Sequence, residues 1–272
     1  MPNLVFTPNR LFDLSGKTAF VTGGASGLGA RMAAALAAAG ARVAVADVNG
    51  DRAAEVAKTL AAGGRDPMSV AVDVTDPADV RRGVDAVVSR FGGLDIGVNA
   101  AGVAGGLEGE DDPVAIWRRV IDVDLSGLYY CCLAYAEPMR RRGGGSIVNI
   151  ASMSANIVNN FPQPPVAESR VAGLPSYCAA KAGVKQLTKV LAAQWAGAGI
   201  RVNCISPGYM ATEMTREVFE MPEVIASIHE KTPLHRVGQP EDLDGLAVYL
   251  ASSASSFMTG AELLIDGGYS VW

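Results

Sequence analysis

The chain has 272 residues, of which 49% are hydrophobic and 19% charged, and its formal net charge at pH 7 is −5. This composition allows one large buried core, and α/β folds of this length are common as single domains. The densest basic cluster, Arg140, Arg141 and Arg142, fits the cation-favouring end of a helix, so we expect neither a nucleic-acid nor an anionic-membrane partner.

Three further patterns are missing from the sequence. It has no stretch of about 18 apolar residues that would span a bilayer, and residues 1–10 do not read as a signal peptide, so we expect a cytoplasmic protein outside the membrane. The cysteines lack C-x-x-C spacing, so we predict neither disulfides nor a metal site and interpret them as small apolar side chains. They are Cys131, Cys132, Cys178 and Cys204.

The first predicted elements form a strand, a glycine-rich turn and a helix. Residues 18–21 read as a short buried strand, residues 22–29 carry the glycines, and residues 27–39 favour a helix. Glycines let a backbone approach a pyrophosphate, and a helix N-terminus offers unpaired N–H groups and the positive end of its dipole. The order of these elements predicts a dinucleotide-binding loop.

A second predicted strand, residues 42–46, ends at Asp47. An acidic residue at this place can accept hydrogen bonds from the adenosine ribose and would repel a 2′-phosphate, which favours NAD over NADP. The alternative is that Asp47 caps the helix that begins near Gly50. One residue can serve both purposes, so the preference for NAD stands.

Strands and helices continue to alternate along the whole chain. This alternation predicts an α/β fold with a parallel sheet covered by helices on both faces, in a single domain spanning residues 1–272. The remaining predicted strands are 69–73, 94–98, 146–150, 201–205 and 262–265, and the remaining helices are 50–62, 78–91, 114–141, 176–197 and 240–251.

Tyr177 and Lys181 lie four residues apart within one predicted helix, so both side chains leave the same helical face. A phenol has an ordinary pKa near 10, and a neighbouring ammonium group lowers it. The pair could therefore move a proton on or off a substrate oxygen. Taken alone, such a pair more often reflects a surface lysine lying over a tyrosine ring.

Together these motifs resemble the short-chain dehydrogenase/reductase family from about Leu14 to the C-terminus. The sequence matches the family's T-G-x-x-x-G-x-G at residues 22–29, its N-A-G motif at residues 99–102, and its catalytic Ser, Tyr and Lys at Ser152, Tyr177 and Lys181. The resemblance implies a strand order of 3-2-1-4-5-6-7. It also implies cofactor contacts from Gly23, Ser26, Gly27, Leu28, Gly29, Asp47, Asp73, Val74, Asn99, Ala100, Gly102, Tyr177, Lys181, Pro207, Gly208, Met210 and Thr212.

The implied reaction interconverts a secondary alcohol and a ketone with NAD. Tyr177 acts as general acid/base, Lys181 lowers its pKa and holds the nicotinamide ribose, and Ser152 orients the substrate oxygen. Residues 213–236 correspond to a mobile substrate lid. The sequence looks most like the polyol and sugar dehydrogenases of the family, with substrate contacts from Ser154, Asn159 and Tyr209. An apolar ketone, a 3-oxoacyl thioester and a non-catalytic dinucleotide sensor are the alternatives.

Two features depart from the family pattern. Asp124 stands where the family has an asparagine that helps to hold a proton-relay water, and we expect its backbone carbonyl to order that water; the alternative is a solvated helix carboxylate. The segment between Ser152 and Tyr177 is also longer than usual. Its Pro-rich part, residues 159–175, is expected to form an ordered loop at the rim of the pocket.

The C-terminal tail bears on assembly. Tyr269 and Trp272 would be costly to expose to water, and burial against a second subunit would avoid this cost. The alternative is that they fold back onto their own subunit. Because family members are commonly tetramers that pair through two long helices, here near 114–141 and 176–197, and through the last strand, we expect a homotetramer.

Overall fold

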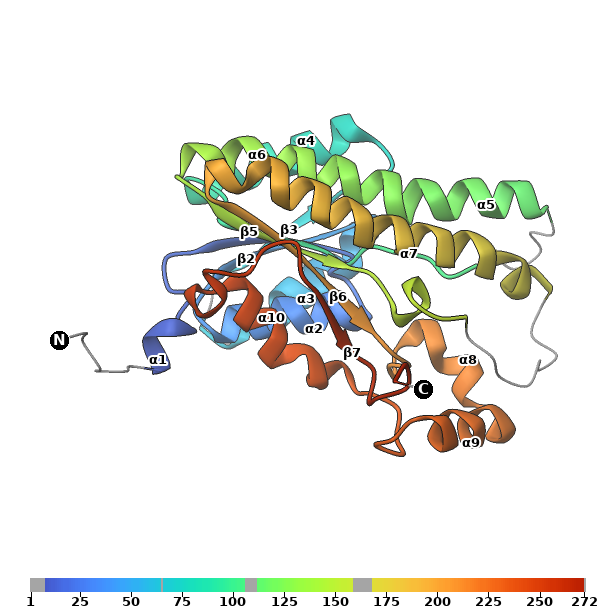
Figure 1. Ribbon diagram of the computed structural model, residues 1–272. Coiled ribbons are helices and arrows are strands. Elements are labelled where there is room, and N and C mark those ends of the chain that lie inside the picture. The colour runs from blue at the N-terminus through green and yellow to red at the C-terminus, as the bar shows by residue number, and fades with distance from the viewer. Residues whose placement is uncertain (1–7, 65, 106–111, 159–167, 272) are drawn as a thin grey trace.

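The computed structural model describes residues 8–64, 66–105, 112–158 and 168–271, and side chains within these ranges except those of residues 8, 9 and 168–173. Seven strands form one sheet in the order β3-β2-β1-β4-β5-β6-β7, and every pair of neighbours is parallel. Figure 1 shows the sheet edge-on between its helices. The predicted fold class and strand order are confirmed.

Each predicted strand lies within two residues of its observed bounds. A strand alternates its side chains between the two faces of the sheet, and β1 shows this directly, because Phe20 belongs to one core cluster while Ala19 and Val21 belong to the other. The strands are β1 (Thr18–Thr22), β2 (Arg42–Asp47), β3 (Met68–Ala71), β4 (Ile96–Asn99), β5 (Gly145–Ile150), β6 (Ile200–Pro207) and β7 (Glu262–Ile265).

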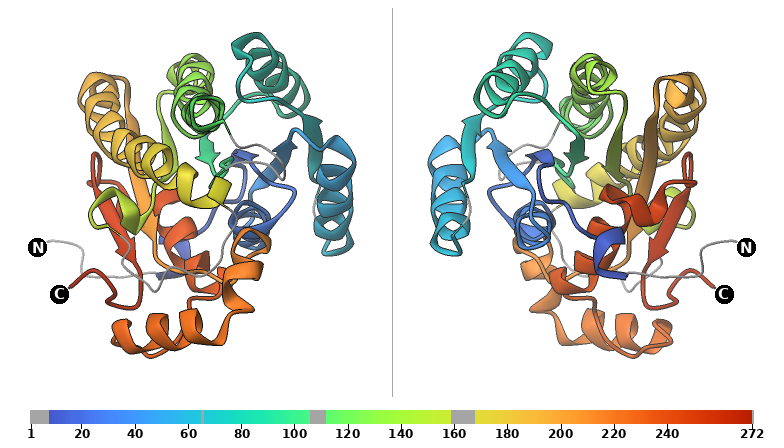
Figure 2. Two further views of the ribbon diagram at one scale, coloured as in Figure 1. Left: turned by 90° about the vertical axis from the view of Figure 1, so that its right-hand side faces the viewer. Right: turned by 90° about the vertical axis from the view of Figure 1, so that its left-hand side faces the viewer.

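Helices cover both faces, as the two views of Figure 2 show. One core cluster packs helices α2 (Gly27–Ala38), α3 (Gly50–Ala62) and α10 (Asp244–Ala251) on the sheet. The other packs α4 (Pro77–Phe91), α6 (Leu128–Arg141) and α7 (Glu168–Trp195) on the opposite face. The short α1 (Pro8–Leu11) precedes β1.

Local signals explain where the helices begin and end. The Asp76 side chain accepts a hydrogen bond from the Ala78 N–H and Pro77 takes the first helical position of α4, while Gly92 ends that helix with a φ of +83°. Residues 240–243, predicted as the start of α10, form a separate 3-10 turn.

The helix predicted over 114–141 is interrupted. It consists of α5 (Pro113–Ile121), a π-helical segment (Asp122–Gly127) and α6. A π-helical turn inserts one extra residue and is frequent at functional sites. Here it contains Asp124, which was singled out as a departure from the family pattern.

The segment before Tyr177 differs from its prediction. Helix α7 begins at Glu168, so residues 168–175 are helical rather than part of an ordered loop, and residues 159–167 lie outside the described ranges. Pro175 removes one backbone donor near the start of a long helix, which the remaining turns tolerate. Between residues 213 and 236, where no helix was predicted, the chain forms α8 (Arg216–Phe219) and α9 (Pro222–Lys231).

Candidate active site

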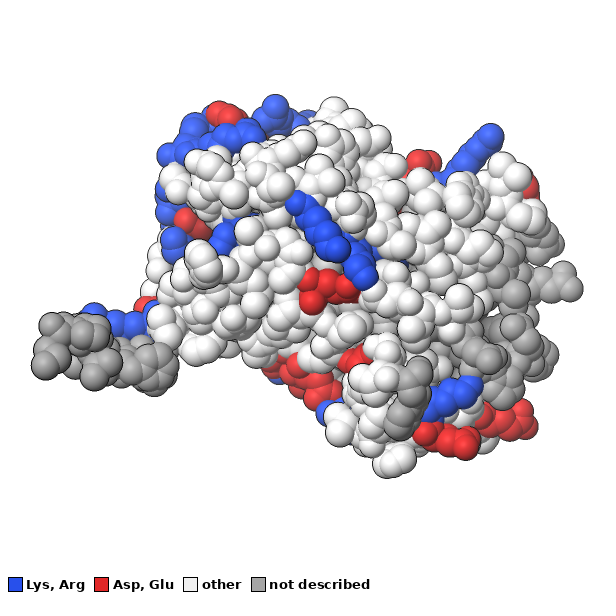
Figure 3. All heavy atoms as spheres, viewed as in Figure 1, with Lys and Arg blue, Asp and Glu red and all other residues white. Residues whose placement is uncertain are grey.

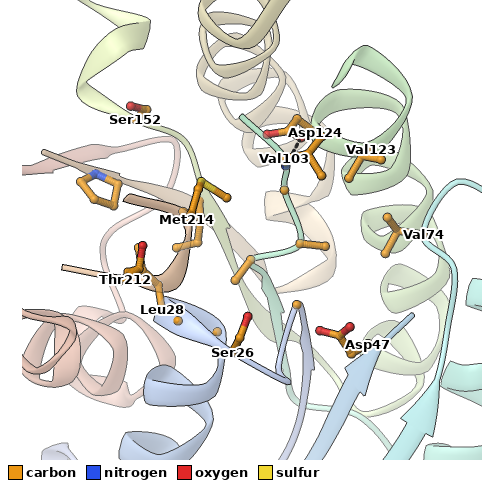
Figure 4. A pocket seen from close by; sticks show the side chains of 18 of the residues that line it. Ser26, Leu28, Asp47, Val74, Val103, Val123, Asp124, Ser152, Thr212 and Met214 are labelled. Atoms are coloured by element: carbon orange, nitrogen blue, oxygen red, sulfur yellow. Dashed lines mark hydrogen bonds between the residues drawn. The ribbon is translucent and has the colours of Figure 1, made fainter. Parts of the chain in front are cut away.

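A cavity of about 500 Å³ opens at the carboxyl ends of the strands, where α/β sheets bind their ligands. Figure 4 shows Asp47 at the end of β2 and Ser152 on the opposite side, with the glycine loop and Thr212 between them. The cavity is lined by Asp124, Ser152 and all the predicted cofactor contacts except Asn99. These contacts are Gly23, Ser26, Gly27, Leu28, Gly29, Asp47, Asp73, Val74, Ala100, Gly102, Tyr177, Lys181, Pro207, Gly208, Met210 and Thr212.

The glycine loop packs so closely against neighbouring backbone atoms, its own and those of residues 100–101, that only glycine fits. A Cβ on Gly29 would lie 2.1 Å from the Gly23 carbonyl oxygen, and a Cβ on Gly23 would lie 2.6 Å from the Ala101 nitrogen. Gly27 adopts a φ of +51° at the start of α2. The loop therefore brings the N-terminus of α2 against the floor of the cavity, the arrangement that cradles a pyrophosphate.

Asp47 is held by two backbone donors. Its carboxylate accepts hydrogen bonds from the Ala25 N–H at 3.1 Å and from the Asn49 N–H at 3.0 Å. Asn49, not Asp47, caps α3, because the Asn49 side chain accepts from the Arg52 N–H. The alternative role of Asp47 as the helix cap is therefore wrong, and the carboxylate faces the cavity.

Asp73 and Val74 lie on the same side of the cavity as Asp47. The Asp73 carboxylate accepts hydrogen bonds from the backbone N–H of Thr75 at 2.9 Å and from its hydroxyl at 2.7 Å. These bonds fix the turn after β3, and the Val74 side chain points toward the cavity in Figure 4.

Asn99 is the one predicted cofactor contact that the structure places away from the cavity. Its amide is buried and donates hydrogen bonds to Asn149 Oδ1 at 2.9 Å and to Cys132 Sγ at 3.2 Å. Asn149 in turn donates to the Thr188 hydroxyl on α7. This chain joins two central strands to the helix of Tyr177, so the Asn99 side chain supports the site from within the core.

Ser152 follows β5 and begins a 3-10 turn. Its Oγ accepts a hydrogen bond from the Ser154 N–H at 3.1 Å, so Ser152 caps this turn. The same hydroxyl also hydrogen-bonds Tyr177, and both residues line the cavity. An accepting hydroxyl still has its own proton to donate. That proton can reach the Tyr177 oxygen or a substrate oxygen.

Lys181 lies beneath Tyr177, with its Nζ 5.4 Å from the centre of the phenol ring. The ammonium group is almost fully buried. It donates to the Ile150 carbonyl at 3.1 Å and forms an ion pair with Asp124 at 2.9 Å. The Ile150 carbonyl was not recognised in the sequence, since a backbone acceptor leaves no signal in residue identity.

The pKa of Tyr177 lies above its ordinary value. Burial is the largest cause, the Lys181 charge opposes it, and the Asp124 charge reinforces it. Lysine thus acts in the predicted direction, but burial and Asp124 outweigh it. Burial also works against the Lys181 ammonium, but the Asp124 carboxylate and Tyr177 together oppose it, and the pKa of Lys181 lies above its ordinary value.

Asp124 is fully buried, so its interpretation as a solvated carboxylate is wrong. Besides Lys181, its side chain accepts a hydrogen bond from the Val103 N–H at 2.8 Å, drawn as a dashed line in Figure 4. A Cβ on Gly102 would lie only 3.0 Å from Asp124 Oδ2, so glycine leaves room for the carboxylate. Burial raises the pKa of Asp124, while Lys181 opposes this shift.

Of the predicted substrate contacts, the two that the structure describes, Ser154 and Tyr209, do not line this cavity. Ser154 is buried beside Ser152, and Asn159 lies outside the described residues. The Tyr209 ring packs edge-on against Tyr269 at 5.3 Å and lines a separate cavity of about 140 Å³. Tyr269 is therefore buried within its own subunit, as in the alternative interpretation of the tail, and Trp272 lies outside the described residues.

The start of the predicted lid reaches the cavity through Glu213, Met214 and Thr215. The Met214 side chain points into the cavity in Figure 4. His235 lies 3.1 Å from the His229 carbonyl through its Nδ1, at the C-terminal end of α9. This contact agrees with the interpretation of the two histidines as surface or capping residues.

The described residues were also compared with the expectations for disulfides, metal sites and membrane spans. Cys131 and Cys204 are buried and unpaired thiols, and burial raises their pKa values to about 12 and about 11. Within the described ranges no cluster of His, Cys, Asp and Glu could hold a metal ion. None of the helices in those ranges combines the length and the apolar character that a membrane span requires.

A parallel sheet with a glycine loop at its carboxyl edge defines a dinucleotide-binding protein of the Rossmann type. A family model described as enoyl-(acyl carrier protein) reductase matches residues 23–270. The chain belongs to the short-chain dehydrogenase/reductase family, which binds a nicotinamide dinucleotide, and the resemblance seen in the sequence is confirmed.

Curated relatives align over nearly the whole chain. It is 41% identical to galactitol 2-dehydrogenase (L-tagatose-forming) of Cereibacter sphaeroides, covering 96% of this chain and 98% of that protein. It is 40% identical to D-threitol dehydrogenase of Mycolicibacterium smegmatis, with 96% and 95% covered. It is 38% identical to 3beta-hydroxysteroid dehydrogenase 1 of Eggerthella lenta, with 96% of each covered.

Solved structures share the fold. A short-chain type dehydrogenase/reductase from Mycobacterium marinum superposes with a TM-score of 0.86 at 41% identity, covering 96% of this chain and 98% of that one. A gluconate 5-dehydrogenase from Burkholderia cenocepacia, in complex with NADP and tartrate, gives 0.87 at 33% identity, with 98% and 100% covered. The fold thus accommodates NADP in at least one relative.

Proposed function

We propose that the protein is an NAD-dependent oxidoreductase that interconverts a secondary alcohol and a ketone, with a polyol or sugar as substrate. The observation that carries the proposal is the arrangement of Ser152, Tyr177 and Lys181 around one cavity beside the glycine loop. The named polyol dehydrogenases, about 40% identical over nearly the full chain, support the substrate class.

The nicotinamide supplies the hydride acceptor when NAD is bound, and the protein handles the proton. In the oxidative direction the Tyr177 oxygen takes the proton of the alcohol, and in reduction it returns that proton to the ketone oxygen. Ser152 donates a hydrogen bond that orients the substrate oxygen. Lys181 stabilises the phenolate from below the ring and lies close enough to the cavity to hold a ribose hydroxyl.

The charges around the cavity support NAD as the cofactor. Asp47 accepts from backbone donors at the end of β2, where it can also accept from the adenosine ribose. Among the described residues that line the cavity, Lys181 is the only cation, and it belongs to the Tyr177 end. Val48, which follows Asp47, is apolar and 75% exposed, so it offers nothing to a 2′-phosphate.

Replacing Asp47 with serine should shift the ratio of kcat/KM for NADP to that for NAD toward NADP by about tenfold or more, because a carboxylate that repels the 2′-phosphate is removed. Initial rates with each cofactor measure the ratio. Asp51→Ser, an equal charge change in the first turn of α3, is the matched control. An unchanged ratio in Asp47→Ser would remove Asp47 from cofactor selection.

Replacing Gly29 with alanine should weaken NAD binding by about tenfold or more. The new Cβ would lie 2.1 Å from the Gly23 carbonyl, so the loop must move, and such overpacking also costs about 1–3 kcal/mol of stability. Calorimetric titration with NAD and a thermal melt measure both effects. Gly245→Ala is the control, because nothing lies within 4 Å of its Cβ position. Unaltered NAD affinity in Gly29→Ala would contradict the pyrophosphate assignment.

A second substrate class has its own support. The steroid dehydrogenase relative acts on a large apolar alcohol by its name, and Val103, Val123 and Met214 line the cavity here. NADH formation at 340 nm should therefore be followed across hexitols, pentitols and hydroxysteroids. Fast turnover of a polyol supports the proposal. Turnover of steroids alone would keep the chemistry and discard the polyol, and NAD binding without any turnover would favour a dinucleotide sensor.

Assembly as a homotetramer is also part of the proposal. Apolar side chains are exposed along α5, α6 and α7, where Figure 3 shows uncharged surface interrupted by cations on α7 and at the end of α6, while acidic groups lie around the lid helices. These side chains are Val114, Trp117, Tyr129, Leu133 and Val190. Light scattering coupled to gel filtration should give four times the mass of the 28.1 kDa chain.

We also propose that the protein is located in the cytoplasm.

A further inference from the structure

An ion pair joins the start of the lid to the adenosine end of the cavity. Arg52, in the first turn of α3, donates from Nη2 to Glu213 Oε2 at 2.8 Å, although the two residues are 161 positions apart in the chain. Glu213 follows Thr212 and lines the cavity. The pair therefore bridges the helix that follows Asp47 and the segment that begins the lid.

Three carboxylates act on the Arg52 guanidinium, those of Glu213, Asp47 and Glu55, and Glu213 is the one with which it forms an ion pair. The hydrogen bond to Glu213 is the main reason why the pKa of Arg52 lies above its ordinary value, and the Asp47 charge acts in the same direction. An arginine beside the end of the second strand is the group that accommodates the 2′-phosphate in NADP-binding Rossmann folds, because its planar fork matches phosphate oxygens. Arg52 has this chemistry, but its guanidinium is engaged by Glu213.

We propose that Glu213 is a second determinant of cofactor preference, which disfavours NADP by holding Arg52 in the Arg52–Glu213 ion pair and by adding a negative charge at the rim. This inference rests on the proposed preference for NAD. Asp47 repels the 2′-phosphate from within the cavity, while Glu213 withholds the arginine that would otherwise bind it. The preference for NAD over NADP therefore depends partly on Glu213, a residue of the lid that is far from β2 in the sequence.

The exposure of the pair limits the size of the effect. The Arg52 and Glu213 side chains are 47% and 50% exposed, and exposed ion pairs are weak because water and salt screen them. Losing Glu213 alone should therefore favour NADP by about threefold to fivefold. Once Asp47 is also removed, Glu55 is the one carboxylate of the three that still acts on Arg52, so the released arginine is freer to bind the phosphate and the two changes together should exceed the product of the single effects.

Binding measurements test the inference without requiring a substrate. The dissociation constants of NADPH and NADH are measured by calorimetry for the wild type, Glu213→Gln, Asp47→Ser and the double variant Asp47→Ser/Glu213→Gln. We expect Glu213→Gln to tighten NADPH about threefold to fivefold and to leave NADH within about twofold, with a larger gain in the Asp47→Ser background. Glu220→Gln, an exposed lid residue with the same charge change, is the matched control.

Adding Arg52→Ala to the double variant should abolish the gain in NADPH affinity. The inference is overturned if Glu213→Gln tightens NADPH no more than Glu220→Gln, or if the gain survives without Arg52. Arg216 lies 3.9 Å from Glu213 and is a second cation that the substitution would release, so survival of the gain would transfer the role to it. Equal affinity of the wild type for both cofactors would instead refute the NAD preference, while the ratio between variants would still test Glu213.

Discussion

The Tyr177→Phe variant should lose at least about 10³-fold in kcat while binding NAD within about twofold of the wild type. Phenylalanine keeps the ring and its packing but removes the oxygen that, in the proposed mechanism, exchanges the substrate proton. Lys181 and Ser152 remain, but neither replaces that oxygen, because Lys181 is buried beneath the ring and bonded to Ile150 and Asp124. Initial rates and calorimetric NAD binding measure the two quantities separately.

Tyr249→Phe provides the control for this variant, since it makes the same change on α10, away from the cavity-lining residues. It should keep the wild-type kcat. A Tyr177→Phe variant that retains more than about a tenth of the wild-type kcat would show that another group transfers the proton.

The Asp124→Asn variant should move the pH dependence of alcohol oxidation to lower pH. In the proposed mechanism, oxidation needs the ionised phenol, so its rate should rise with pH through the pKa of Tyr177. The Asp124 charge raises that pKa, and removing the charge lowers it. The decline of ketone reduction at high pH should move in the same direction, because reduction needs the protonated phenol.

Two comparisons separate this effect from damage to the fold. Asp122→Asn changes an exposed carboxylate in the same π-helical segment and should leave the pH profile in place. Asparagine at position 124 can still accept from the Val103 N–H, so the variant should fold, with a thermal melt to measure what the lost ion pair costs. If the pH–rate profile of Asp124→Asn coincided with that of the wild type, the Asp124 carboxylate would have no influence on the pKa of Tyr177.

The charge of the buried cluster depends on the residue at position 124. In the wild type, the net charge of Tyr177, Lys181 and Asp124 is zero when the phenol is protonated and −1 when it is ionised. An asparagine would make the same cluster positive and then neutral. Because burial strengthens electrostatic effects, Asp124 favours the phenol that donates a proton to a ketone. The departure from the family pattern thus bears on the pH at which each direction runs fastest.

Much of the fold was predictable because its signals are local. Continuous apolar runs marked β1 and β2, and Gly23, Gly27 and Gly29 marked the loop, since each strand and turn is specified by a few neighbouring residues. The cavity followed from these elements, because parallel strands bring their carboxyl ends to one edge. Tyr177 and Lys181 were placed together by helical spacing alone.

The features that were not predicted depend on contacts between distant segments. The helical periodicity of residues 113–141 gives no sign of the π-helical segment, which places Asp124 against Lys181. Asn99 was assigned to the cofactor by its motif, yet its amide belongs to a buried network with Asn149. The Arg52–Glu213 ion pair joins two segments that no sequence spacing relates.

Transfer of deuterium, as deuteride, from the substrate carbon to the cofactor tests the central proposal most directly. The protein would be incubated with NAD and a hexitol deuterated at its carbinol carbons, and the cofactor and sugar products analysed by mass spectrometry. We predict deuterium-labelled NADH together with the matching ketose, and formation of both products by Tyr177→Phe at a rate at least about 10³-fold lower. Bound NAD with no NADH formed, or NADH without the deuterium label, would contradict hydride transfer from a polyol in this cavity.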